Sequence, residues 1–131
     1  MSVVSGLTMD DSSTIGFVLD CLYSEAIDMA ELRKWCEFVI VSNDMESIPD
    51  YMFDLVSFDG GLSKVVDCVG FSPAVECHGR DEYALYGIAY LRGRDVYDPP
   101  VTFDDAESAL VGAPHILERF KSTFPFIVFG E

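Results

Sequence analysis

Apolar residues recur three and four positions apart along most of this chain, and that spacing is typical of helices with one buried face. The clearest case has a stripe made of Leu32, Trp35, Cys36, Val39 and Ile40. Asp28, with Glu31 three residues later, predicts a capping box at the start of this helix. Its far end, residues 38–41, is rich in β-prone residues, so a strand is the competing interpretation there.

Weaker versions of the same spacing predict further helices. The first begins in a capping stretch at residues 11–14 and runs to Leu22. Three more cover residues 49–58, 62–69 and 81–91. The last two run from Thr102 or Asp104 to Val111 and from Pro114 to about Lys121. Pro49 suits the first turn of the helix over 49–58, and Gly70 is expected to end the helix over 62–69. Gly87 in the middle of a helix costs about 1 kcal/mol relative to alanine, which indicates that another helix crosses closely there.

The remaining segments are connections and ends. Ser72-Pro73 opens a short turn or helix, and the longest connection contains residues 92–94 and 98–100. Residues 126–129 are strand-like but have no obvious pairing partner, so they are expected to pack as an extended apolar tail. The expected core contains Leu32, Trp35, Cys36, Val39, Leu55, Leu85 and Ile88.

Helices joined by short connections indicate an all-α fold, a compact bundle of about six or seven short helices. With 131 residues the chain forms one domain over 1–131, in which residues 1–10 are expected to be a loosely ordered arm. An α+β fold with a small sheet is the alternative, because the pattern leaves residues 62–70 and 124–131 open as helix, strand or loop.

The amino-acid composition excludes some classes of function. Half of the residues are apolar, which excludes a disordered chain, and 23 acidic against 8 basic residues give a net charge of −15. Direct nucleic-acid binding is not expected, because phosphate contacts come mainly from Lys and Arg. The same charge argues against docking on anionic membranes.

The first residues of the chain and its cysteines indicate in which cellular compartment the protein is expected. The first six residues contain no basic stretch, and no apolar run reaches the roughly 18 residues of a membrane span. Four cysteines without CxxC spacing are expected to be buried, reduced side chains. The protein is therefore expected to be cytoplasmic.

The sequence contains no convincing motif for metal binding or catalysis. A calcium loop beginning at Asp11 fails because Ile15 and Leu22 occupy ligand positions. The adjacent Cys77 and His78 lack zinc-ligand spacing, and nucleotide-binding and hydrolase motifs are absent from the sequence. We expect no enzyme, no catalytic residue, no metal and no cofactor, with a small enzyme using Cys77 or His78 as one alternative.

Two stretches contain many carboxylates and no Lys or Arg. The first, between Lys34 and Lys64, holds Glu37, Asp44, Glu46, Asp50, Asp54 and Asp59. The second, between Arg94 and Arg119, holds Asp95, Asp98, Asp104, Asp105, Glu107 and Glu118. A solvated surface that keeps the protein soluble is one interpretation, and a surface that binds a basic partner is the other. The aromatic residues Tyr51, Phe58, Tyr97 and Phe103 are either interface anchors or core.

Three segments carry helix-core patterns, namely Trp35–Ile40, Ile48–Leu55 and Ala84–Gly93. With these segments, the protein resembles helical immunity proteins of bacterial toxin systems, including contact-dependent growth inhibition. It is similar to them also in being a small, strongly acidic chain without a catalytic motif. The resemblance implies a protein that binds a cognate toxin domain, often a nuclease, and blocks its active site. Immunity families are mutually dissimilar, so the resemblance assigns no functional residue.

The acidic stretches suggest how such binding would work. A nuclease groove must be positive to hold phosphates, so a basic toxin domain is the expected partner. We expect the first stretch to contact it, through Asp44, Glu46, Asp50, Asp54 and Asp59. An acidic adaptor or nucleic-acid mimic that binds another basic protein is the other alternative. The sequence indicates neither the partner's activity nor the oligomeric state.

Overall fold

The computed structural model describes residues 5–129. Seven α-helices follow one another as α1 (Ser13–Tyr23), α2 (Met29–Ser42), α3 (Asp50–Val56), α4 (Val65–Val69), α5 (Arg80–Leu91), α6 (Phe103–Val111) and α7 (Pro114–Thr123). Two 3₁₀ turns, η1 (Met45–Ser47) and η2 (Leu62–Lys64), precede α3 and α4. The described residues contain no strand, so the all-α prediction is confirmed and the alternative with a small sheet is wrong.

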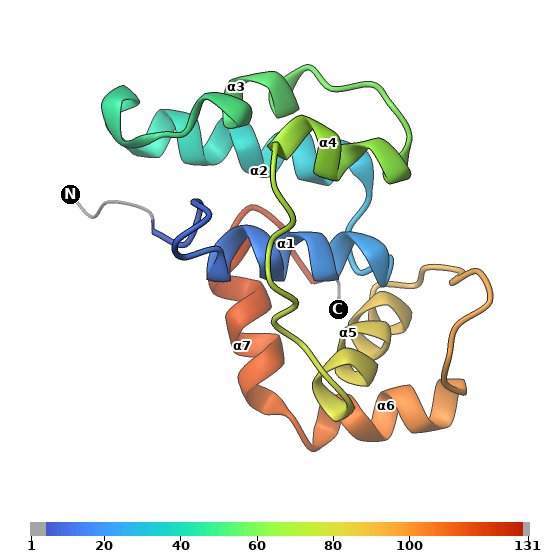
Figure 1. Ribbon diagram of the computed structural model, residues 1–131. Coiled ribbons are helices and arrows are strands. Elements are labelled where there is room, and N and C mark those ends of the chain that lie inside the picture. The colour runs from blue at the N-terminus through green and yellow to red at the C-terminus, as the bar shows by residue number, and fades with distance from the viewer. Residues whose placement is uncertain (1–4, 130–131) are drawn as a thin grey trace.

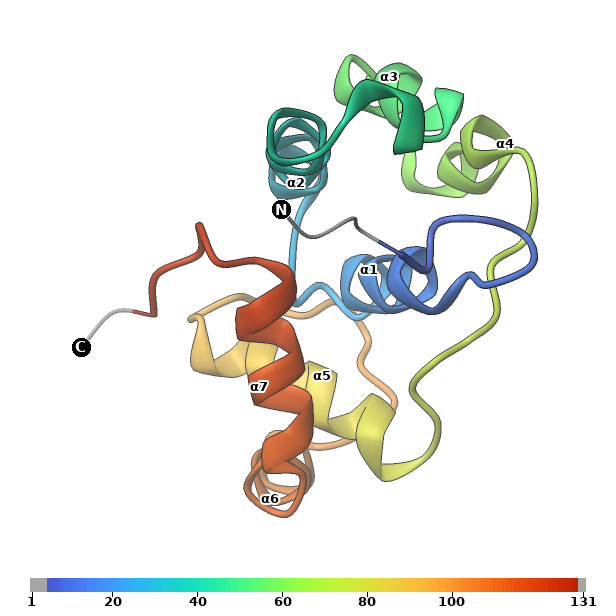
Figure 2. The same ribbon diagram turned by 90° about the vertical axis from the view of Figure 1, so that its left-hand side faces the viewer.

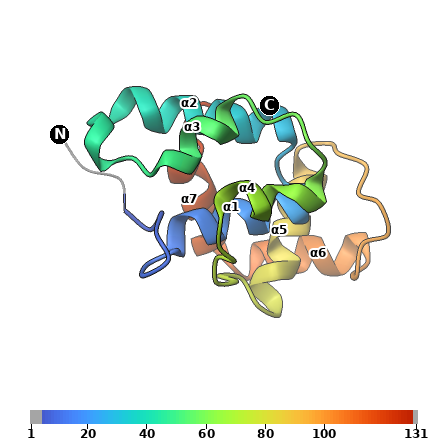
Figure 3. The same ribbon diagram turned by 45° about the horizontal axis from the view of Figure 1, so that its top comes forward.

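Helix α1 lies between two groups of helices (Figures 1 and 2). The first group is α2, α3 and α4, with α3 packed along α2 (Figure 3). The second group is α5, α6 and α7, in which α5 and α6 make the most extensive helix–helix contact. The first acidic stretch therefore lies in the first group, and Asp104, Asp105, Glu107 and Glu118 of the second stretch lie in the other.

Helix α2 shows why the sequence predicted its start so well. The Asp28 carboxylate accepts a hydrogen bond from the Glu31 N–H at 2.8 Å, and the Glu31 carboxylate accepts one from the Asp28 N–H at 3.1 Å. The helix continues through residues 38–41, so the strand alternative is wrong there. The reason is that Val39 is buried against the rest of the core, and this packing outweighs local β propensity.

The expected core residues, Leu32, Trp35, Cys36, Val39, Leu55, Leu85 and Ile88, are all buried. The close helix crossing expected at Gly87 is also present. A Cβ at Gly87 would lie 2.6 Å from the Ala106 carbonyl oxygen and 2.9 Å from the Leu110 Cβ, both on α6. Glycine is therefore required for α5 and α6 to approach this closely.

The short turn or helix expected after Ser72 is not helical, because residues 72–78 cross the outside of α1 as irregular chain. Their backbone donors bond to α1 and its N-cap instead of to their own carbonyls. The Ala74 N–H donates to Ser12 Oγ, and the Glu76 and Cys77 N–H groups donate to the Asp20 carboxylate at 2.8 and 3.0 Å.

The described part of the expected N-terminal arm, residues 5–10, is held against the helices. The Gly6 carbonyl accepts hydrogen bonds from the Thr14 and Ile15 N–H groups, and Leu7 is 3% exposed. Residues 1–4 lie outside the described part. The expectation of a loosely ordered arm thus differs from the structure at residues 6–7, because the sequence does not show that Leu7 belongs to the core.

Other boundaries differ by small amounts. Helix α3 ends at Val56 instead of Phe58, and residues 62–69 are divided between η2 and α4. Gly70, with φ 92°, ends α4 as predicted. Residues 124–129 form a turn and irregular chain whose rings pack partly against the core, while residues 130–131 lie outside the described part.

Candidate functional site

Four of the five predicted partner-binding residues surround the start of α3, and we call Asp44, Glu46, Asp50 and Asp54 the α3 face. Asp44 is the N-cap residue of η1, whose turn contains Glu46. Asp50 begins α3, and Asp54 follows one helical turn later on the same side. All four side chains are exposed, and none forms an ion pair with another described residue.

A shallow depression of about 470 Å³ lies beside the α3 face. Asp50 and Asp54 both line it, and its other walls include the buried apolar residues Leu7 and Val69. No Lys or Arg of the described chain lines this depression. It therefore combines two carboxylates with an apolar floor, an arrangement that suits a basic side chain with an apolar stem.

The fifth predicted residue, Asp59, does not belong to this arrangement. It follows α3, at the opposite end of the helix from Asp50. The neighbouring Phe58 carbonyl accepts a hydrogen bond from the Arg33 guanidinium at 3.1 Å. The stretch between Lys34 and Lys64 lacks cations in sequence, but folding brings Arg33 to the backbone carbonyl that directly precedes Asp59.

The aromatic anchors considered for the first stretch are not available at the surface. Tyr51 is 8% exposed and donates its hydroxyl hydrogen bond to the Leu7 carbonyl, and Phe58 is half-buried. Exposed apolar residues in this region include Met9, which lines the depression, and Val41 and Met45, at 72%, 81% and 72%. Helical spacing from the buried positions of α2 could have placed Val41 outside, whereas no sequence signal singles out Met45.

The α6 part of the second acidic stretch lies at the opposite end of the molecule from α3 (Figure 1). Its residues are Asp95 and Asp98 in the 92–102 connection, Asp104, Asp105 and Glu107 on α6, and Glu118 on α7. Here the aromatic candidates are exposed, Tyr97 at 86% and Phe103 at 52%. The Arg80 side chain shares a surface depression with Asp105, so part of this stretch has a cation nearby.

Comparisons with known proteins do not extend this picture. No family model, no curated protein and no solved structure matches this chain. The function is therefore argued from the geometry.

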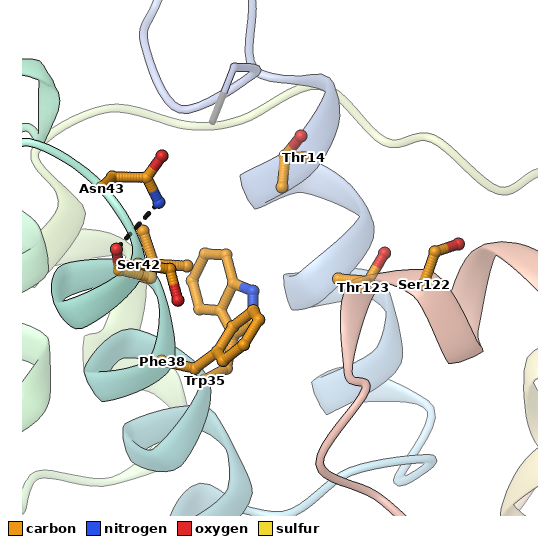
Figure 4. A pocket seen from close by; sticks show the side chains of 8 residues that line it. Thr14, Trp35, Phe38, Ser42, Asn43, Ser122 and Thr123 are labelled. Carbon is orange, nitrogen blue, oxygen red and sulfur yellow. Dashed lines mark hydrogen bonds between the residues drawn. The ribbon is translucent and has the colours of Figure 1, made fainter. Parts of the chain in front are cut away.

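A neutral pocket of about 320 Å³ lies between α2, the start of α1 and the end of α7 (Figure 4). Figure 4 shows hydroxyl and amide groups around its rim and the Trp35 indole at its floor. Ser122 and Thr123 donate their hydroxyl hydrogen bonds to carbonyls of their own helix. The pocket contains no titratable group, and Trp35 is only 1% exposed, so the lining offers no acid–base chemistry.

The Cys77 and His78 alternative gains no support from the geometry. Burial raises the pKa of the Cys77 thiol to about 12, whereas a nucleophilic cysteine needs a lowered pKa. His78 is exposed, and its Nε2 lies 3.0 Å from the Val75 carbonyl oxygen.

Residues 5–129 provide neither a metal-binding cluster nor a membrane-spanning helix. No group of three or more His, Cys, Asp or Glu side chains in this range is arranged to hold a metal ion. None of the helices in the same range combines the length and apolar character needed to cross a bilayer.

Proposed function

We propose that this protein is an immunity protein that binds a cognate basic toxin domain, a nuclease, and blocks its active site with the α3 face. The observation that carries this proposal is the depression beside Asp50 and Asp54, where exposed carboxylates border an apolar floor and no Lys or Arg among residues 5–129 lines the walls. A groove that binds phosphates presents Lys and Arg, and the α3 face offers the complementary charge.

The exposed apolar residues support the same proposal. Stable interfaces combine apolar anchors with a polar rim. Val41 and Met45 are exposed next to Asp44 and Glu46, so apolar and acidic side chains occur together in this region. We place the action of the protein in the cytoplasm, where its four free cysteines would stay reduced.

The test is co-expression with the protein encoded directly upstream, since an immunity gene follows its toxin gene. The expected result is that the upstream protein's C-terminal domain stops growth alone, and that this protein restores growth and forms a complex with it. Nucleic-acid cleavage by the purified domain should stop at equimolar inhibitor. Continued growth arrest and the absence of a complex would contradict the proposal, whereas a complex with a basic protein that has no nuclease activity would favour the adaptor alternative.

A further inference from the structure

A second depression, of about 590 Å³, lies where the end of α1, the start of α2 and the 92–102 connection meet. We call it the Tyr97 pocket, and its lining includes Tyr23, Glu25, Ile27, Met29, Asp95 and Tyr97. It is larger than the depression beside the α3 face and is bordered by a different set of residues. The proposed function makes no use of it.

The walls of the Tyr97 pocket are apolar and aromatic. Ile27 is almost completely buried and forms part of the floor, whereas the Tyr23 and Tyr97 side chains are 43% and 86% exposed. An apolar floor accommodates the methylene stem of a long basic side chain. An exposed aromatic ring attracts the charged end of such a side chain through a cation–π interaction.

The charges in the pocket favour a cation. Asp28 and Asp95 line it together with Glu25, and the only basic lining residue of the described chain is Arg94. The Arg94 guanidinium already bonds to Asp28 at 3.2 Å and to Glu31 at 2.7 Å. Glu25 and Asp95 form no ion pair with another described residue, so two carboxylates remain to attract an incoming cation.

The connection that carries Tyr97 is attached to the opposite wall. The Glu25 carboxylate accepts a hydrogen bond from the Tyr97 N–H at 3.1 Å. Glu25 itself has a positive φ of 68°, and its N–H donates to the Leu22 carbonyl. The Tyr97 backbone is therefore fixed to the Glu25 carboxylate before any partner arrives, which reduces the ordering of the connection that binding requires.

We infer that the Tyr97 pocket binds an arginine or lysine side chain presented by a protein partner. The apolar floor takes the stem, Tyr23 and Tyr97 flank the charged group, and Glu25 and Asp95 balance its charge. This inference rests on the proposed function only in taking the partner to be basic. The binding of the side chain itself is independent of toxin inhibition.

The test is a titration of the ¹⁵N-labelled full chain with N-acetyl-arginine N-methylamide, followed by amide chemical shifts. The neutral control probe is N-acetyl-norleucine N-methylamide, which has an apolar stem without the charge. We expect saturable shifts at the Tyr97, Asp95 and Met29 amides, with the norleucine probe binding at least about fivefold more weakly. The lysine analogue should bind at the same amides.

Two variants sharpen the test. Glu25→Gln keeps an oxygen that accepts the Tyr97 N–H hydrogen bond but removes the charge, and should weaken arginine binding about threefold or more. The matched control Glu37→Gln removes one charge from an exposed position on α2 that lines neither depression, and it should leave binding at the Tyr97 pocket unchanged. Shifts spread evenly over the acidic surface without saturation, or equal binding of the norleucine probe, would overturn the inference.

The two proposals fail separately. If the arginine probe does not bind at the Tyr97 pocket while the protein still neutralises its toxin, only the inference is wrong. If the probe binds as expected while the upstream protein is unaffected, the proposed function is wrong and the pocket keeps its assignment.

Discussion

The two acidic stretches contain six carboxylates each, yet the regions that carry them are supported in different ways. The α3 face is supported by apolar packing and by the hydrogen bond from the Tyr51 hydroxyl to the Leu7 carbonyl. The 92–102 connection begins with Arg92 and Arg94, which both pair with Glu31 at the start of α2. One region thus depends on buried apolar contacts and the other on an ion-pair cluster.

This difference shows what charge along a sequence leaves open. Both stretches lack Lys and Arg in sequence, but among residues 5–129 folding brings no basic side chain to the depression beside the α3 face and places arginines beside the second stretch. The aromatic residues of the two regions also differ in burial, because Tyr51 of the first lies in the core and Tyr97 of the second is exposed. The two regions should therefore respond differently to substitution.

The largest effect is expected at Glu31, whose carboxylate accepts from the Asp28 N–H, Arg92 and Arg94. The Arg92 and Glu31 side chains are only 13% and 18% exposed. Glu31→Ala leaves a nearly buried arginine without a carboxylate to balance its charge, so it should lower the free energy of unfolding by about 3–5 kcal/mol. Urea unfolding measures this change.

The control for that prediction is Glu37→Ala, which removes an exposed carboxylate from the same helix and should change stability by less than about 0.5 kcal/mol. Equal stability changes for the two variants would show that the ion-pair cluster does not support the 92–102 connection.

Asp20 on the central helix tests the segment that crosses α1. Asp20→Ala leaves the Glu76 and Cys77 N–H groups without their acceptor and should lower the free energy of unfolding by about 2 kcal/mol. Asp20→Asn keeps an oxygen that can accept both hydrogen bonds, so its effect should be smaller.

The same site has a pH dependence with a definite sign. Burial raises the pKa of Asp20 above its usual 3.8, outweighing the two backbone hydrogen bonds. The folded state therefore holds this proton more tightly than the unfolded state, and wild type should lose stability relative to Asp20→Asn as pH rises through the raised pKa. Urea unfolding at pH 3.5 and pH 7 measures the difference, and a difference that moves the other way would contradict it.

Gly87 supports the second region through the α5–α6 contact. Gly87→Ala gains helix propensity but places a Cβ 2.6 Å from the Ala106 carbonyl oxygen, so we expect a net loss of about 1–2 kcal/mol. Gly61→Ala is the matched control, because a Cβ there meets nothing within 4 Å and φ is −76°. Its stability should stay equal or rise slightly, as followed by thermal unfolding.

A smaller effect is expected on the side of the α3 face. Tyr51→Phe removes the hydroxyl that bonds to the Leu7 carbonyl while keeping the ring against Phe71. The loss should be about 1 kcal/mol and should not depend on salt, since no ion pair is involved. A loss that disappears in 0.5 M salt would instead point to an electrostatic role.

How much of this could be predicted from the sequence depends on whether the cause is local. The capping box at Asp28 and Glu31 and the close crossing at Gly87 were predicted, because short-range spacing and a single glycine carry those signals. The role of Gly16, where a Cβ would lie 2.3 Å from the Ala74 carbonyl oxygen, was missed because the contact joins distant residues.

The candidate site follows the same rule. The i, i+4 spacing of Asp50 and Asp54 on one helix was predicted, and the structure places both at one depression. The floor of that depression comes from Leu7 and Val69, which are distant in sequence. Arg33, which bonds to the carbonyl of Phe58 just before Asp59, is likewise distant in sequence, so no local pattern could have separated Asp59 from the other four carboxylates.

The central claim is that the α3 face contacts the basic partner, and the most direct test is the dissociation constant of its complex with the upstream toxin domain. Asp50→Asn with Asp54→Asn should weaken binding by about 2–5 kcal/mol, mainly through faster dissociation, with little change in thermal stability. The matched double variant, Asp104→Asn with Asp105→Asn, removes the same charge from exposed positions on α6 and should change binding less than about threefold. Equal weakening by both double variants, or unchanged binding by the first, would contradict the claim.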